Sequence, residues 1–281
     1  MTGAFKQKSS IWILGILILS VLGIATHPDV AWRSAMVLFG LAFVCELVDS
    51  GLGMGYGTIL TPVLLFMGYK PHDIVPTVLL SELLSGFTAA FFHNTVKNVE
   101  LNLRGADFRP AAILAGGSIV GVTVGVLTAI RVPADVLKLG IGCIIFTSGL
   151  VVIVLARRVI RYRSLNMLAL AAVASFNKAA SGGGYGPLVT SGQILSGVRT
   201  QASVGITSFA EAFTCLFAVI LFLLKGGSIN PVLLIPMCGG ALLSVPFAVA
   251  AIKRSREVQL RLIIGVVTLI MGAFTIYKAL Q

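Results

Sequence analysis

The chain has 281 residues, of which 57% are hydrophobic and only 11% are charged, and its mean hydropathy is +1.00. This composition excludes an ordinary soluble globular domain and indicates an integral membrane protein. The net charge of +11 invites the idea of a nucleic-acid partner. However, basic residues of membrane proteins normally gather in cytoplasmic loops, so we expect no nucleic acid to bind.

The first predicted helix covers the apolar run 11–26, which follows Lys6 and Lys8. It ends at Gly23-Ile24-Ala25, a pattern that resembles a signal-peptidase site. The run is long for a signal peptide, so we interpret residues 1–32 as an uncleaved anchor helix.

Two glycine-rich segments interrupt the remaining apolar sequence. The first, Gly53-Met54-Gly55-Tyr56-Gly57, predicts a helical hairpin over 33–68, and the second, Gly182-Gly183-Gly184-Tyr185-Gly186, predicts another over 165–197. The other apolar runs are each about long enough to span a bilayer. They cover residues 74–93, 110–130, 136–156, 203–224, 230–252 and 260–277.

The chain also repeats itself. Tyr56 and Tyr185 are 129 residues apart, and the same offset aligns several further pairs. These pairs are Leu41 with Leu170, Thr61 with Thr190, Gly68 with Gly197, Val75 with Val204 and Glu82 with Glu211. In the later segments the offset is 123, which aligns Gly116-Gly117 with Gly239-Gly240. We therefore predict two repeats, 33–156 and 165–281, joined by a basic cytoplasmic linker at 157–164.

The distribution of basic residues predicts the topology. If both hairpins return to the side from which they enter, 14 of the 21 basic residues face inward. The outer side then carries Arg33, Lys70, Arg131, Lys138, Lys225 and Lys278. If each glycine segment crossed once instead, the basic stretches 157–163 and 253–256 would lie on opposite sides. We therefore predict an all-α polytopic membrane protein with two inverted repeats, each a re-entrant helical hairpin plus three spans, and one extra N-terminal helix.

The glycine turns are the predicted substrate site. Successive backbone N–H groups at a glycine turn, together with the positive end of the following half-helix, favour a small anion. The alternative is that the glycines only allow close helix packing. The candidate substrate-binding residues are Gly53, Gly55, Tyr56, Gly57, Thr58, Thr61, Asn177, Lys178, Gly182, Gly183, Gly184, Tyr185, Gly186 and Thr190.

Ionisable residues in apolar segments are costly and need a reason to be there. Glu82 and Glu211 occupy the same repeat position, so they are candidates for proton coupling, with a purely structural role as the alternative. Asp49 and Lys178 are also equivalent but opposite in sign. We hypothesise either an ion pair between them or a role for Lys178 as the positive end of the anion site. Glu46 qualifies as a further intramembrane carboxyl group.

No metal, disulfide or cofactor site is predicted. Cys45, Cys143, Cys215 and Cys238 lack CxxC and His-pairing spacing, so we expect them to be small buried hydrophobic residues. A sulfur relay through Cys45 or Cys238 is the alternative. His93, Asn94 and Lys97 are expected to be solvated residues at the inner end of a helix.

The duplicated glycine segments and the chain length resemble the TauE/SafE family of sulfite exporters, also called the 4-toluene sulfonate uptake permease family. The resemblance covers nearly the whole chain beyond the first helix. It implies transport of small sulfur-containing anions, such as sulfite or sulfoacetate, across a bacterial-type inner membrane.

We therefore expect a multi-pass secondary transporter coupled to protons or to the membrane potential, with a small anion and the lipid bilayer as partners and with a homo-oligomer left open. A passive anion channel is the main alternative. A membrane-embedded enzyme is less favoured because the sequence has no HExxH or GxSxG motif.

Overall fold

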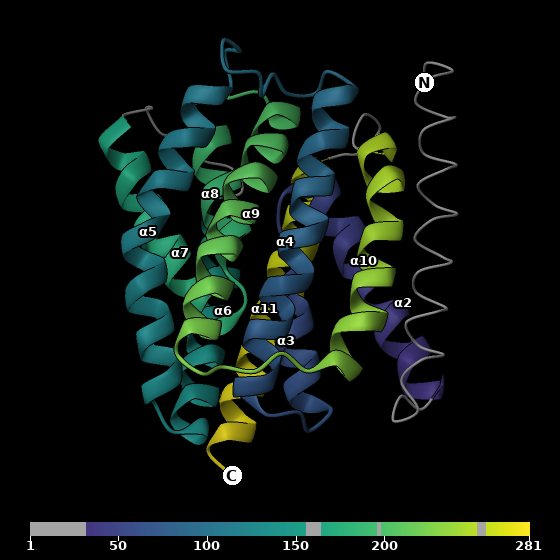
Figure 1. The fold of residues 1–281 in the computed structure, drawn as a ribbon, viewed down its shortest axis with the longest axis vertical. Coiled ribbons are helices and arrows are strands. Elements are labelled where there is room, and N and C mark those ends of the chain that lie inside the picture. The colour runs from purple at the N-terminus through teal and green to yellow at the C-terminus, as the bar shows by residue number, and fades with distance from the viewer. Residues whose placement is uncertain (1–31, 156–163, 196–197, 252–256) are drawn as a thin grey trace.

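The computed structural model describes residues 32–155, 164–195, 198–251 and 257–281 (Figure 1). Within these ranges the chain forms ten α-helices and no β-strand, which confirms the predicted all-α fold. The helices are α2 (Trp32–Leu52), α3 (Tyr56–Phe66), α4 (Pro71–Thr95), α5 (Phe108–Arg131), α6 (Ala134–Leu155), α7 (Ser164–Ser181), α8 (Tyr185–Leu195), α9 (Thr200–Leu224), α10 (Pro231–Ala251) and α11 (Glu257–Ala279). The expected anchor helix at 11–26 and residues 157–163 of the expected linker lie outside the described residues.

Six helices of the described chain are long and apolar enough to cross a membrane, namely α2, α4, α5, α6, α9 and α10. Five of them coincide with predicted spans. The sixth, α2, has the length of a full span although the sequence pattern assigned it to a hairpin. α3 and the apolar part of α7, Met167–Ser181, are shorter. These lengths fit a multi-pass membrane protein.

The helices break at both glycine motifs, as the sequence predicts. α2 ends just before Gly53 and α7 just before Gly182, and the next helix begins three residues later in each case. The φ angles are 71° at Gly53 and 138° at Gly55, and 76° at Gly182 and 81° at Gly184. Side chains rarely adopt these angles, so glycine permits both turns.

The segment formed by α2 and α3 begins and ends at one end of the bundle. Ala35, in the first turn of α2, packs against Val232 and Ile235 near the start of α10. Lys278, in the last turn of α11, donates a hydrogen bond to the carbonyl of Phe66 at the end of α3 (3.0 Å). The start of α10 and the end of α11 both lie at the bottom of Figure 1.

The segment formed by α7 and α8 lies toward the other end. Met167, near the start of α7, clusters with Val99 in the loop between α4 and α5, which is at the top of Figure 1. Gly192, near the end of α8, faces the side chain of Leu170 in α7.

Helices at equivalent repeat positions make equivalent contacts. α2 packs along α10, and α7 packs along α5. Gly240 of α10 faces the backbone of Phe39, and Gly117 of α5 faces Leu168. Phe39 and Leu168 are 129 residues apart, and Gly117 and Gly240 are 123 residues apart. α4 and α9 pack on each other, as do α6 and α11.

Substitution of glycines in α5 tests the close packing of α5 on α7. Gly121→Ala is expected to lower the free energy of unfolding by about 1–3 kcal/mol, because the new methyl group would overlap the carbonyl of Ala172. Gly116→Ala in the same helix is the control, since nothing lies within 4 Å of that position. Thermal unfolding in detergent measures both variants. Equal midpoints for the two would contradict the observed helix contact.

Candidate functional site

The two glycine turns touch each other at the centre of the bundle. A Cβ atom at Gly57 would overlap the carbonyl of Gly182, and one at Gly186 would overlap the carbonyl of Gly53. A Cβ atom at Gly183 would lie 2.8 Å from the backbone of Gly57. The backbones are therefore in direct contact, which requires glycine at these positions on both sides.

Two threonines join the turns by hydrogen bonds. The amide of Gly184 donates to Thr58 Oγ1 (3.0 Å), and the hydroxyl of Thr190 donates to the carbonyl of Gly53 (2.6 Å). Both threonines are buried. Thr58 is in α3 and Thr190 is in α8, so the helix after each turn contributes one side chain to the junction.

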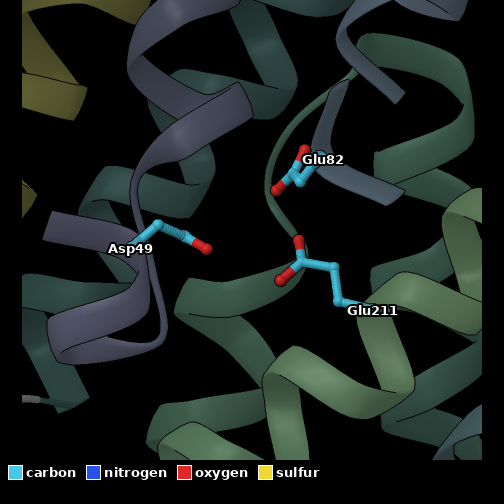
Figure 2. Close-up of side chains that lie close together, drawn as sticks. All are labelled: Asp49, Glu82 and Glu211. Atoms are coloured by element: carbon cyan, nitrogen blue, oxygen red, sulfur yellow. The ribbon is translucent and has the colours of Figure 1, made fainter. Parts of the chain in front are cut away.

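A buried lysine lies beside this junction. Lys178, in the last turn of α7, is 1% exposed and forms ion pairs with Glu82 of α4 and with Glu211 of α9 (2.8 Å to Glu211). Figure 2 shows the carboxyl groups of Glu82, Glu211 and Asp49 directed toward one another from three different helices. One carboxylate oxygen of each lies within 4.8 Å of the other two. Glu82 and Glu211, which occupy the same position at the sequence offset of 129, therefore lie close together in the structure.

Asp49 has a different partner from the one hypothesised. Among the described residues, the ion pairs of Lys178 are with the two glutamates and not with Asp49. Asp49 Oδ1 instead accepts a hydrogen bond from the amide of Tyr56 (3.2 Å), the first residue of α3. It thereby satisfies one free N–H of that helix N-terminus. At the start of α8, the equivalent side chain is Lys178, which has no acceptor atom to offer.

The remaining predicted residues surround the turns. The hydroxyl oxygen of Tyr56 is 2.6 Å from Ser81 Oγ, and Tyr185 is fully buried. Thr61 is also fully buried, and its hydroxyl has no hydrogen-bond partner among the described residues. Asn177 is half-buried beside Gly184.

A fourth buried carboxyl group, that of Glu46, lies near the cluster, and the sequence pattern gave it no role. Glu46 accepts hydrogen bonds from the hydroxyls of Ser50 (2.5 Å) and Ser85 (2.8 Å). His93 Nε2 is 2.9 Å from the carbonyl oxygen of Ser50, and Asn98 Nδ2 is 3.0 Å from His93 Nδ1. The expectation that His93 is a solvated residue at a helix end is therefore wrong, because α2 and the loop after α4 bury it completely.

Helical spacing could have located two residues that the sequence interpretation missed. Thr207 lies one turn before Glu211 in α9, and Ser85 lies one turn after Glu82 in α4. Thr207 Oγ1 is 2.9 Å from Thr190 Oγ1 and accepts a hydrogen bond from Gln193 Nε2 (2.9 Å). Thr207 is thus a polar residue on the same face of α9 as Glu211, and Ser85 is one on the same face of α4 as Glu82.

Metal and disulfide chemistry have little support from this geometry. The carboxylates of Asp49, Glu82 and Glu211 are close enough to share a cation, but the ammonium group of Lys178 already contacts two of them. All four cysteines are free, and Cys143 is exposed on α6, unlike the buried Cys45 and Cys215. The expectation that every cysteine is buried is therefore wrong for Cys143, and Cys238 is only partly buried.

Comparison with known proteins identifies the family. The family model for the sulfite exporter TauE/SafE matches residues 38–275, which include Asp49, Glu82, Lys178 and Glu211. The chain belongs to the TauE/SafE family. The match confirms the resemblance seen in the glycine motifs, and a multi-pass membrane transporter is the corresponding general function.

A relative of the chain is the "Probable membrane transporter protein YtnM" of Bacillus subtilis (strain 168). It is 23% identical over 257 residues, which cover 87% of this chain and 83% of YtnM. No solved structure matches the chain.

Proposed function

We propose that this TauE/SafE protein is a secondary transporter of small sulfur-containing anions, such as sulfite or sulfoacetate, in a bacterial-type inner membrane. The observation that carries the proposal is the contact between two broken helices beside a buried ammonium group. Irregular backbone at membrane depth is tolerated only where it is buried in protein or lines a polar cavity. Broken helices at corresponding positions of two repeats are typical of transport sites.

We also propose that residues 33–156 and 165–281 are inverted repeats and that each glycine segment is re-entrant. The equivalent contacts of Gly240 with Phe39 and of Gly117 with Leu168 support a pseudo-two-fold relation. The placement of the two broken segments toward opposite ends of the bundle supports the inversion. In such a fold, the substrate is held near the bilayer midplane, and the two faces open alternately.

The anion-binding groups in this proposal are the backbone N–H groups of the turns, the hydroxyls of the nearby threonines and the ammonium group of Lys178. The positive end of α3 is already capped by Asp49 through the amide of Tyr56. The positive end of α8 has Lys178 at the corresponding position instead. We therefore expect the second turn to contribute more to anion binding than the first.

Charge balance supports proton coupling. Glu46, Asp49, Glu82 and Glu211 are buried near one another, whereas Lys178 is the buried cation that contacts this group in the described chain. Leaving three buried carboxylates without a counter-charge would be very unfavourable. Protons are the simplest neutralising species, and their release or uptake would couple anion movement to a pH gradient.

Uptake into proteoliposomes tests both parts of the proposal. Sulfite, thiosulfate, sulfate, taurine and sulfoacetate are offered with and without an imposed pH gradient. We expect saturable uptake of at least one sulfur anion, stimulated by the gradient. Glu82→Gln and Glu211→Gln are each expected to lower that stimulation about tenfold, because a neutral amide cannot carry the proton. Exchange of labelled for unlabelled anion would continue.

Glu100→Gln is the matched control, since Glu100 is an exposed carboxylate in the loop between α4 and α5. Gradient stimulation that survives in both Glu82→Gln and Glu211→Gln would contradict proton coupling by these residues. Flux without saturation or exchange would favour the passive channel. Neither nucleic-acid binding nor enzymatic turnover forms part of the proposal.

A further inference from the structure

A cavity of about 310 Å³ lies at the end of the bundle where α3 and α11 end. Its walls come from α3, from the turn before α4, from the start of α6 and from the end of α11. Much of the lining is apolar, with Pro62, Leu65 and Phe274 among its residues. A cavity of this size with apolar walls suits a small molecule that has an apolar part.

Three lysines line the same cavity, namely Lys70, Lys138 and Lys278. Lys138 is paired with Asp135 (3.2 Å), and Lys278 lies 4.9 Å from the centre of the Phe66 ring. The ammonium groups therefore outnumber the carboxylate that contacts them. A hollow lined by one sign of charge raises the local concentration of ions of opposite sign.

These lysines are three of the six basic residues that the sequence assigns to the outer side. Basic residues on that side oppose the usual bias toward the cytoplasm, so topology does not explain them. All three instead line one cavity, where their positive charges act together. Anion attraction explains the position of all three.

The cavity also lies next to the glycine turns along one helix. Pro62 lines the cavity, and the preceding residue of α3 is Thr61. Thr61 Oγ1 is 2.8 Å from the position that a Cβ atom of Gly182 would occupy. The hydroxyl of Thr61, which has no hydrogen-bond partner among the described residues, therefore lies against the second turn, one residue along α3 from the cavity wall.

We propose that this cavity is the outer vestibule of the transporter, and that it collects organic anions with an apolar part, such as alkyl or aryl sulfonates, before they move along α3 to the glycine turns. The inference rests on the proposed transport function. A polar cavity of about 290 Å³ at the other end of the bundle, lined by Lys97 and Arg199, supports it. Arg199 precedes α9 as Lys70 precedes α4, at the repeat offset of 129.

Cysteine labelling tests the vestibule without measuring transport. Ala134→Cys, at the cavity wall, is made in a Cys143→Ala background and treated with methanethiosulfonates that carry either a sulfonate or a quaternary ammonium group. The sulfonate reagent is expected to react about tenfold faster than the cationic one. The preference should disappear in the Lys70→Gln/Lys138→Gln/Lys278→Gln background, and butanesulfonate should slow the labelling.

Ser228→Cys is the control, because Ser228 is exposed in the loop after α9, outside the cavity. It should show no preference and no protection by butanesulfonate. Equal reaction rates of the two reagents at Ala134→Cys would overturn the vestibule. Protection by vesicles of phosphatidylglycerol but not by butanesulfonate would also overturn it, since a lipid headgroup would then be the occupant.

Uptake kinetics then separate the vestibule from the transport function. In low salt, the triple lysine variant is expected to raise the KM for butanesulfonate about tenfold, and the difference should shrink at 1 M salt, where the screening length is about 3 Å. A KM equal to that of the unmodified protein would refute the vestibule alone. Absence of uptake by the unmodified protein would refute the proposed function, whereas the labelling result would still stand.

Discussion

Lys178→Met is expected to abolish anion uptake and to lower the free energy of unfolding by about 3–5 kcal/mol. The ammonium group of Lys178 separates the carboxyl groups of Glu82 and Glu211, and all three side chains are buried. Without it, two carboxyl groups face each other in an apolar interior with no counter-charge. Proteoliposome uptake measures the first effect, and thermal unfolding in detergent measures the second.

Removal of the glutamate charges distinguishes a structural lysine from a substrate-binding one. Lys178→Met/Glu82→Gln/Glu211→Gln should regain most of the lost stability, because the two glutamates that paired with Lys178 then carry no charge. It should not regain exchange of labelled for unlabelled anion if Lys178 binds the anion, because the glutamate substitutions alone leave that exchange intact. Lys225→Met is the control, since Lys225 is exposed at the end of α9. Normal uptake and stability of Lys178→Met would contradict the assigned role of the ion pairs.

The glycine repeat made much of the site predictable from the sequence. The offset of 129 marked the two turns, and also Glu82 and Glu211, as equivalent positions, and in the structure the carboxyl groups of these two glutamates lie close together. The same offset gave a misleading partner for Lys178. The repeat makes Lys178 equivalent to Asp49 in the sequence. The residues that Lys178 contacts depend instead on how α4 and α9 pack against α7, and that packing produces no pattern of fixed spacing in the sequence.

The buried histidine shows a second limit. His93 lies near the end of α4, where a charged and polar sequence follows, so the pattern favoured exposure. Its burial depends on the carbonyl of Ser50, which is 43 residues earlier in the chain. Ser50 lies in the last turn of α2, just before the glycine break. The sequence alone does not show where that turn lies relative to α4, so it could not identify the partner of His93.

Gly57→Ala and Gly186→Ala are each expected to reduce uptake more than tenfold. Both residues are in the first turn of a half-helix, where alanine is favourable, so the substitution changes only the space between the turns. The new methyl group would overlap the carbonyl of Gly182 in the first variant and that of Gly53 in the second. A backbone carbonyl cannot rotate away as a side chain can, so the turns must separate, at a cost of about 3 kcal/mol.

Gly51→Ala is the matched control, because it is also a glycine-to-alanine change near the break, in the last turn of α2. The nearest atom to its added Cβ would be the carbonyl oxygen of Ala248 at 4.0 Å, an ordinary contact. Uptake and stability should therefore be unchanged. If Gly57→Ala and Gly186→Ala unfold no more easily than Gly51→Ala and transport equally well, the turns are not held in contact during transport. The anion would then have to bind elsewhere, because the turns can form a single site only while their backbones touch.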